Sequence, residues 1–128
     1  MKVTFNHRDP VYLQVVRYFK EEIANGRLLA GQEIPSRREL AGELQINPNT
    51  VQKAYKEMEE QHLIRTEGNS PSRITTDERV LSSIREELIM EAVHTFVSTI
   101  KAIDVPVDEL LHIVKSTYVS ERSKGESE

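Results

Sequence analysis

The sequence of 128 residues contains no cysteine, which excludes both a disulfide framework and a metal site built from thiolates. The reducing cytoplasm is therefore the expected compartment. Long hydrophobic runs are also missing, and the segment from Met1 to Arg8 lacks an apolar core of the length that a secretory signal needs. We therefore expect neither a membrane span nor a secretory leader.

The motifs of common catalytic sites are missing as well. The chain has no glycine-rich phosphate loop, no G-x-S-x-G string and no nucleophile with a base beside it. Glu91 precedes His94 by three residues, but no further metal ligand accompanies this pair. The other histidines are isolated in sequence: His7, His62 and His112. We therefore expect no enzyme activity, no metal and no cofactor.

The net charge of −4 argues by itself against a nucleic-acid ligand. The charge is unevenly distributed, however. Residues 1–76 hold 11 basic and 10 acidic side chains, a net charge of +1, whereas residues 77–128 hold 6 and 11, a net charge of −5. Phosphate would repel the acidic C-terminal part, which should point away from DNA. An ordinary pair of solvated helices would have the same asymmetry, and this alternative stays open.

Two short helices joined by a tight turn are expected between residues 36 and 60. Ser36 and Glu39 have the S-x-x-E spacing of a capping box, which predicts the start of the first helix. Asn47 is a good N-cap for the second helix. Pro48 suits its first position, because an N–H group there would have no partner within the helix.

The second of these helices is expected to have two chemically different faces. Apolar residues recur at i, i+3, i+4 and i+7, as Val51, Ala54, Tyr55 and Met58. The opposite face carries amide, hydroxyl and ammonium groups, from Asn49, Thr50, Gln52, Lys53 and Lys56. Amides pair with adenine, and lysine pairs with guanine or phosphate. This division is what a helix in the major groove of DNA requires.

A helix before this pair and a hairpin after it complete an expected N-terminal domain over residues 1–76. The helix lies between Asp9 and Gly26. In the hairpin, residues 63–66 and 72–75 have the composition of short strands, and Gly68 marks the turn between them.

Two further helices are expected over residues 77–119, separated at Pro106. Two helices alone cannot enclose a core, so we expect the stripe of the first helix to pair with its copy in a symmetric dimer. The stripe consists of Leu81, Ile84, Leu88, Ala92, Phe96 and Ile100. Packing of this stripe on its own N-terminal domain is the alternative. The polar residues 120–128 are expected to be a disordered tail.

Three strings in the N-terminal part are informative together: P-S-R-R-E-L-A from Pro35, N-P-N-T-V-Q-K-A-Y from Asn47, and M-E-E-Q-H-L-I ending at Ile64. They resemble the N-terminal winged-helix domain of GntR-type bacterial transcription regulators. The second string, together with the short C-terminal segment, is similar to the YtrA-like subfamily, which implies control of a transporter operon. The family usually closes its wing with a second glycine and an aromatic residue, where this chain has Ser70 and Pro71, with Glu67 at the tip.

The resemblance also implies residues that contact DNA. Arg38 matches the family's arginine at the start of the helix that Ser36 caps, and this arginine contacts phosphate or a base. A surface ion pair with a glutamate is the alternative. Arg37 lies where the family varies, and both roles are open for it. The remaining candidates are Asn47, mainly a cap, Asn49, Thr50 and Gln52 for base reading, Lys53 for phosphate or guanine, and Gly68 in the wing.

The sequence thus predicts a mainly α protein with an N-terminal winged helix-turn-helix, a small β-wing and a C-terminal two-helix dimerisation segment. Its expected function is sequence-specific transcription regulation, as a repressor that binds a near-palindromic operator in double-stranded DNA as a homodimer. No small-molecule effector is identified by the residues. The alternative is a winged-helix protein-interaction module that does not bind DNA. The polar face of the helix that Asn47 caps carries no acid, which favours DNA.

Overall fold

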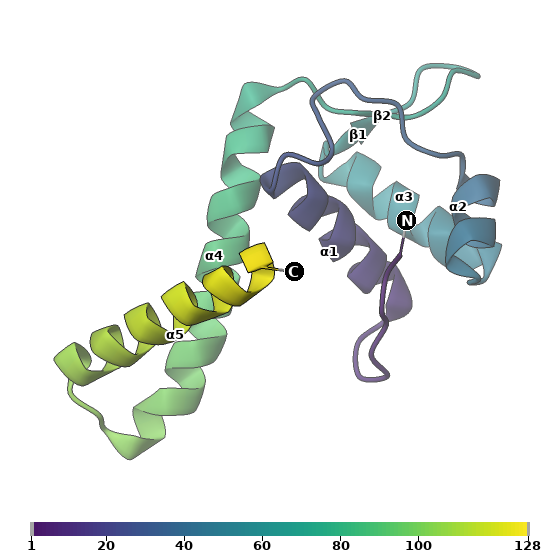
Figure 1. Ribbon diagram of the computed structural model, residues 1–128. Coiled ribbons are helices and arrows are strands. Elements are labelled where there is room, and N and C mark those ends of the chain that lie inside the picture. Colours follow the sequence, from purple (N-terminus) through teal and green to yellow (C-terminus); the bar gives the residue numbers. More distant parts are fainter. Residues whose placement is uncertain (1, 128) are drawn as a thin grey trace. The chain divides into compact units, whose positions relative to one another are not determined.

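The computed structural model describes residues 2–127. In chain order, its elements are α1 (Val11–Ala24), α2 (Arg37–Leu44), α3 (Pro48–Glu60), β1 (Ile64–Arg65), β2 (Arg73–Ile74), α4 (Glu78–Ile100), the 3-10 turn η1 (Lys101–Ile103) and α5 (Val107–Ser127) (Figure 1). The chain divides into two compact units, the first ending at Met90 and the second beginning at Glu91. No helix within the described residues is both long and apolar enough to cross a lipid bilayer.

The predicted starts of the second and third helices are confirmed. The Ser36 hydroxyl accepts a hydrogen bond from the N–H of Glu39, and the Glu39 carboxylate accepts one from the N–H of Ser36, which is a complete capping box. The Asn47 side chain accepts from the N–H of Asn49 at 2.8 Å. Both helices therefore begin where these side chains satisfy N–H groups that have no partner inside the helix.

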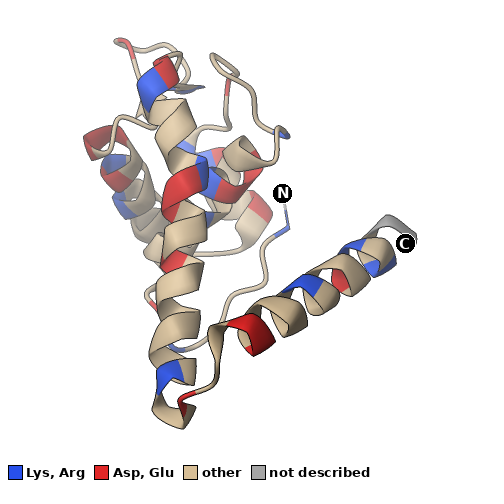
Figure 2. Ribbon diagram, turned by 90° about the vertical axis from the view of Figure 1, so that its left-hand side faces the viewer, with Lys and Arg blue, Asp and Glu red and all other residues tan. Residues whose placement is uncertain are grey.

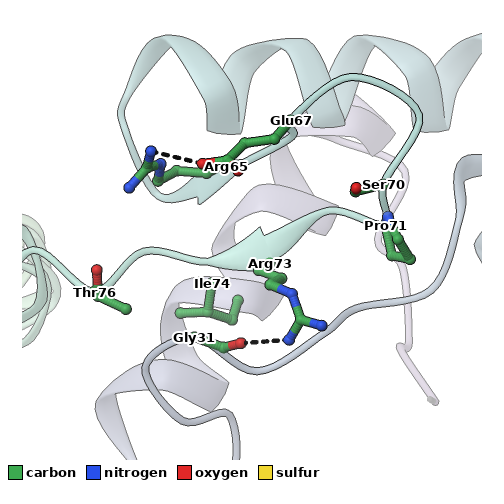
Figure 3. A pocket seen from close by; sticks show the side chains of 8 residues that line it. All are labelled: Gly31, Arg65, Glu67, Ser70, Pro71, Arg73, Ile74 and Thr76. Carbon is green, nitrogen blue, oxygen red and sulfur yellow. Dashed lines mark hydrogen bonds and ion pairs between the residues drawn. The ribbon is translucent and has the colours of Figure 1, made fainter.

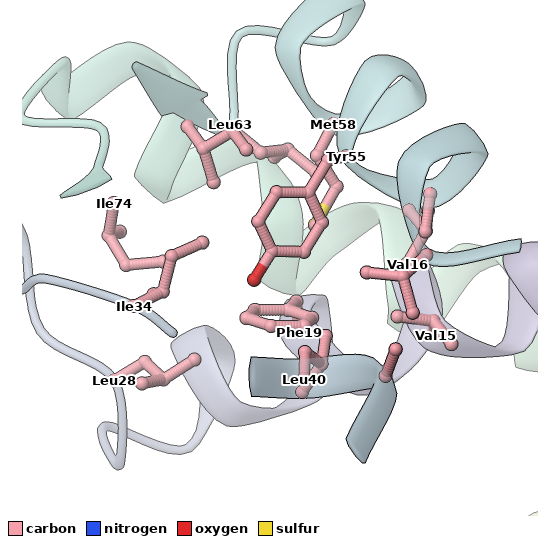
Figure 4. Packing of buried hydrophobic residues seen from close by; sticks show 14 of the residues in the cluster. Val15, Val16, Phe19, Leu28, Ile34, Leu40, Tyr55, Met58, Leu63 and Ile74 are labelled. Atoms are coloured by element: carbon pink, nitrogen blue, oxygen red, sulfur yellow. The ribbon is translucent and has the colours of Figure 1, made fainter. Parts of the chain in front are cut away.

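The core of the first unit lies where α1 and α2 pack against α3. Figure 4 shows Tyr55 and Phe19 at its centre, with aliphatic side chains around them. Their rings meet edge to face with centroids 6.3 Å apart, a favourable arrangement for aromatic pairs. The four residues of the predicted apolar face of α3 are all fully buried: Val51, Ala54, Tyr55 and Met58. The helical spacing of these residues thus identified the inward face of α3.

The two short strands form an antiparallel hairpin against this core. Ile64 is opposite Ile74, and Arg65 is opposite Arg73. Both isoleucines are buried and both arginines are exposed, as the alternation of side chains along a strand requires. Three helices followed by this two-stranded wing make up the winged-helix fold that the sequence predicts.

The first turns of α4 pack on the winged helix, which corrects half of the predicted dimer stripe. Ile84 is 1% exposed and belongs to the core, while Leu81 and Leu88 are partly buried against it. The Lys20 ammonium also reaches the carboxylate of Glu87 at 2.9 Å. Ile84 therefore completes the core of its own domain, and Leu81 and Leu88 pack against that core, because burial there removes apolar surface from water without a second copy. The first unit accordingly extends to Met90, past the boundary expected after residue 76.

The second unit consists of the end of α4, η1 and α5. None of its described side chains between residues 91 and 125 is buried. Large apolar side chains are exposed along both helices, among them Val93, Phe96, Val97, Leu111, Val114 and Tyr118. Within the predicted stripe, Ala92 and Phe96 are exposed and Ile100 is half-buried.

The predicted tail at residues 120–128 differs from the structure, in which α5 continues to Ser127. Charged residues of good helix propensity follow Ser120, and Glu121 lies one turn before Lys124, with the charged groups 3.9 Å apart. Polar composition was therefore a poor guide to disorder here, since a solvated helix has the same composition. Glu128 lies outside the described residues.

Candidate nucleic-acid interface

The turn between α2 and α3 sets the direction of the third helix. Gln45 takes a left-handed conformation with φ of 55° and ends α2, and its N–H donates to the carbonyl of Ala41. The N–H of Ile46 donates to the same carbonyl at 3.1 Å. Because the chain turns within these residues, α3 begins at Pro48, directly after its cap Asn47, and packs against α2 as the second helix of a helix-turn-helix does.

The outward face of α3 carries the predicted base-reading residues. Asn49, Gln52 and Lys53 are exposed, and Thr50 is half-buried. The Asn47 side-chain oxygen is engaged in the helix cap, so its amide has a structural role whatever it contacts outside. The ammonium of Lys53 lies 4.4 Å from the centroid of the Tyr12 ring, a cation–π contact between α3 and α1. This contact holds the Lys53 ammonium over a side chain of α1.

The two adjacent arginines at the start of α2 have different surroundings. Arg37 donates to the Glu59 carboxylate at 2.9 Å, and its guanidinium lies 5.0 Å from the centroid of the Tyr55 ring. Arg38 is exposed, and among the described residues it has no hydrogen bond or ion pair. The surface ion pair considered for Arg38 is therefore found at Arg37, and Arg38 is the arginine that remains available to a phosphate.

Tyr55 connects this corner to the core. Its hydroxyl donates to the backbone carbonyl of Pro35, directly before the capping box of α2. Burial raises the pKa of the Tyr55 phenol above its ordinary value, and the positive charge of Arg37 opposes part of this effect. The phenol therefore stays protonated at neutral pH and keeps its donor role.

The wing brings two further arginines to the surface, and no sequence motif singled them out. The Arg65 guanidinium pairs with Glu67 at 2.9 Å, and Arg73 donates to the carbonyl of Gly31 at 3.0 Å (Figure 3). Gly68 has φ of +56°, which the wing turn requires of it. Outward alternation in the two predicted strands was the signal that could have identified both arginines.

Charge on the first unit is mixed, since Figure 2 shows basic and acidic residues on the same helices. Individual cations therefore matter more than a broad basic surface. The exposed ones beside the polar face of α3 or in the wing are Arg38, Lys53, Lys56, Arg65 and Arg73. Among residues 2–127, no cluster of His, Cys, Asp and Glu is suited to hold a metal ion.

Residues 11–74 match the family described as bacterial regulatory proteins, gntR family. A GntR family transcriptional regulator from Listeria monocytogenes has a similar structure, with a TM-score of 0.83 and 31% sequence identity, over 88% of this chain and 98% of that one. The uncharacterised HTH-type transcriptional regulator YhcF of Bacillus subtilis is 29% identical over 88% of this chain and 93% of its own length.

The HTH-type transcriptional repressor YtrA of Bacillus subtilis is 46% identical over 57 residues, which cover 44% of each chain. This likeness agrees with the YtrA-like pattern of the N-P-N-T-V-Q string. The region that matches the family runs from α1 to β2 and includes the elements that position Arg38 and the polar face of α3. The chain therefore belongs to the gntR family of bacterial regulatory proteins and is a DNA-binding transcription regulator built on a winged helix.

Proposed function

We propose that this regulator is a repressor that binds a near-palindromic operator as a homodimer. One observation carries the DNA part of the proposal. From Pro48 to Lys56, α3 presents exposed amide and ammonium groups, with no acidic residue among them. A protein-interaction module has no need of such a face, whereas a helix in the major groove does.

Each polar residue of α3 has a role that its chemistry supports. Asn49 and Gln52 can each donate to N7 and accept from the N6 amine of adenine through one amide, and a good bidentate pair contributes about 1–3 kcal/mol of discrimination. Lys53 suits guanine or phosphate. Since α3 contains no arginine, the residue most often paired with guanine, we expect half-sites rich in A·T.

Phosphate contacts would fix the position of the domain on the duplex. Arg38 is the second residue of α2 and has no hydrogen bond or ion pair among the described residues. Arg65 and Arg73 occupy the exposed side of the wing, opposite each other in the hairpin. Contacts of this kind set register and affinity without reading sequence.

The homodimer is supported by the second unit, which has no buried core of its own among residues 91–125. Val93, Phe96, Val97 and Tyr118 are each more than 40% exposed, a large apolar surface for a solvated protein. Burial against the same surface of a second copy is the simplest way to remove it from water.

Two recognition helices related by a two-fold axis would enter successive major grooves about 34 Å apart, one helical turn of DNA. Protein bound in this way excludes polymerase from an overlapping promoter. The repressor role is supported by the similarity to YtrA, which is described as a repressor.

Selection of bound duplexes from random DNA with the intact chain tests the proposal. We expect enrichment of an inverted repeat with A·T-rich half-sites, because the dimer presents two identical α3 faces. A protein-interaction module would enrich no sequence. Enriched sites without two-fold symmetry would rule out the homodimeric mode while leaving DNA binding in place.

A further inference from the structure

The carboxylate of Glu59 connects three elements of the winged helix. One of its oxygens accepts from the guanidinium of Arg37, at the start of α2, at 2.9 Å. The same oxygen accepts from the hydroxyl of Thr66, the first residue after β1, at 3.1 Å. Glu59 itself is in the last turn of α3. A single side chain of α3 thus joins α2 and the wing.

The network continues across the base of the wing loop, residues 66–72. The hydroxyls of Thr66 and Ser72 are hydrogen-bonded to each other. Because the single hydroxyl hydrogen of Thr66 points to the carboxylate, Ser72 must donate to Thr66. The Ser72 carbonyl in turn accepts from the N–H of Ile34 at 3.0 Å. Both ends of the loop are therefore tied to the rest of the domain.

The strands of the wing have other ties, because β2 exchanges backbone hydrogen bonds with Gly31 and Gln32, but the loop between the strands has few. Each of its strands is two residues long, so the hairpin ladder is short. The loop contributes a turn in which the N–H of Ser70 donates to the carbonyl of Glu67 at 2.9 Å, but this bond is internal to the loop. The contacts through Glu59 are those that relate the loop to α3.

We propose that Glu59 is a positioning residue, which holds the wing at a set orientation to α3 so that both meet one DNA half-site. Arg37, Glu59, Thr66 and Ser72 together form what we name the Glu59 clasp. Arg37 is the counter-ion in this arrangement and orients the carboxylate. The inference rests on the proposed operator binding and adds to it a residue that need not touch DNA.

The proposal makes a prediction of opposite sign to simple electrostatics. Replacing Glu59 by Ala removes a negative charge and leaves Arg37 unpaired, so charge alone predicts tighter binding to DNA. Loss of the clasp predicts weaker binding, because a wing loop that moves more freely relative to α3 must be ordered when the complex forms.

The test compares four single variants of the intact chain. Glu59→Ala removes the carboxylate that accepts from Arg37 and Thr66, and Thr66→Val removes the hydroxyl that donates to it. Glu60→Ala removes the same charge from the next position of α3, and Glu60 is exposed and has no partner among the described residues. Thr76→Val repeats the hydroxyl deletion at an exposed position outside the clasp. Titration uses the selected duplex at several salt concentrations, and hydrogen exchange follows residues 64–74 in the free protein.

Both clasp variants should bind the operator about tenfold more weakly, the effect of one charge-assisted hydrogen bond. Their log-log salt slope should flatten by about one unit for each phosphate that the wing no longer reaches. Exchange over residues 64–74 should become faster while α3 is unchanged. The Glu60→Ala variant should bind as tightly as the unmodified chain or more tightly, and Thr76→Val should match the unmodified chain.

Tighter binding by Glu59→Ala, or unchanged exchange over residues 64–74 in both clasp variants, would overturn the proposal. Thr66→Val decides if Glu59→Ala does not fold, because Thr66 is exposed. Glu59→Gln keeps an acceptor oxygen for the Thr66 hydroxyl and should restore most of the slow exchange. If the intact chain enriched no duplex, operator binding would fail, but the exchange comparison would still decide whether Glu59 holds the wing.

Discussion

Adjacent residues of one type have different roles at the start of α2. One step along a helix turns a side chain by about 100°, so Arg37 and Arg38 face different surroundings. Arg37 lies over the Tyr55 ring and pairs with Glu59, whereas Arg38 is exposed. Of the two, only Arg38 can meet a phosphate without first giving up an intramolecular partner.

Replacement of each arginine by alanine should therefore have different effects. Arg38→Ala should leave stability unchanged and flatten the log-log salt slope of DNA binding by about one unit, because one cation no longer meets a phosphate. Arg37→Ala should lower the free energy of unfolding by about 1 kcal/mol, the size expected for a partly exposed, well-oriented pair. Denaturant melts and salt titrations of both variants measure this, and an unchanged slope for Arg38→Ala would remove it from the interface.

Glu67 at the wing tip is another residue whose replacement should change DNA binding without changing stability. Its carboxylate pairs with Arg65, and both side chains are largely exposed. Glu67→Gln should free the Arg65 guanidinium for phosphate and remove a like-charge repulsion from DNA. Binding to random duplex should tighten, most strongly at low salt, with little change in melting temperature. The same affinity as the unmodified chain at every salt concentration would place the wing tip away from the backbone.

At the scale of elements, α3 has a cap that stabilises its start and an outward face for which we propose DNA recognition. Asn47 caps the helix through its side chain, while the side chain of Asn49 is exposed and offers its amide outward. The buried face of the same helix holds α1 and α2 in place. We therefore expect DNA specificity and fold stability to depend on different residues in and beside this helix.

Alanine at these two positions should separate the two functions. Asn47→Ala should lower the free energy of unfolding by about 0.5–2 kcal/mol, because the helix is no longer capped. Asn49→Ala should leave unfolding nearly unchanged but weaken operator binding by about 1–3 kcal/mol and relax the preference at one position of each half-site. Thermal melts and titrations with operator and random duplex distinguish these effects. Equal losses on both duplexes would show that Asn49 only positions the backbone.

At the scale of the whole molecule, α4 serves two units. Its first turns contribute Ile84 to the core of the winged helix, and its later turns carry exposed apolar residues such as Phe96. One continuous stripe in sequence therefore has two environments. This division predicts that charge introduced at its two ends will have different consequences.

Ile84→Asp should unfold the winged-helix domain, because it buries an unpaired carboxylate in the core. Phe96→Asp should leave the domain folded but give monomers, since the carboxylate would lie in the proposed subunit interface. Monomers should bind the operator only weakly, as they lack the advantage of two linked half-sites. Circular dichroism, sedimentation and titration on the same samples test both variants. A Phe96→Asp protein that stays dimeric would contradict the proposed interface.

Local signals in the sequence predicted much of the winged helix. The capping box at Ser36, the cap at Asn47 and the spacing of the buried residues of α3 act within a few residues of each other, and each was found where expected. The wing strands were also located by their short apolar segments and the turn at Gly68. Such features depend on backbone groups and helix periodicity, which the local chain already specifies.

The sequence by itself therefore determined where the helices begin, the inward face of α3 and the family. Only the tertiary structure decided which arginine is paired, that Glu59 meets both α2 and the wing, and that Ile84 belongs to the first core. It also extended α5 to Ser127, where composition had suggested a tail. The physical reason is that caps and periodicity act over a few residues, whereas these contacts join residues far apart in sequence, such as Arg37 and Glu59, and depend on how the helices pack.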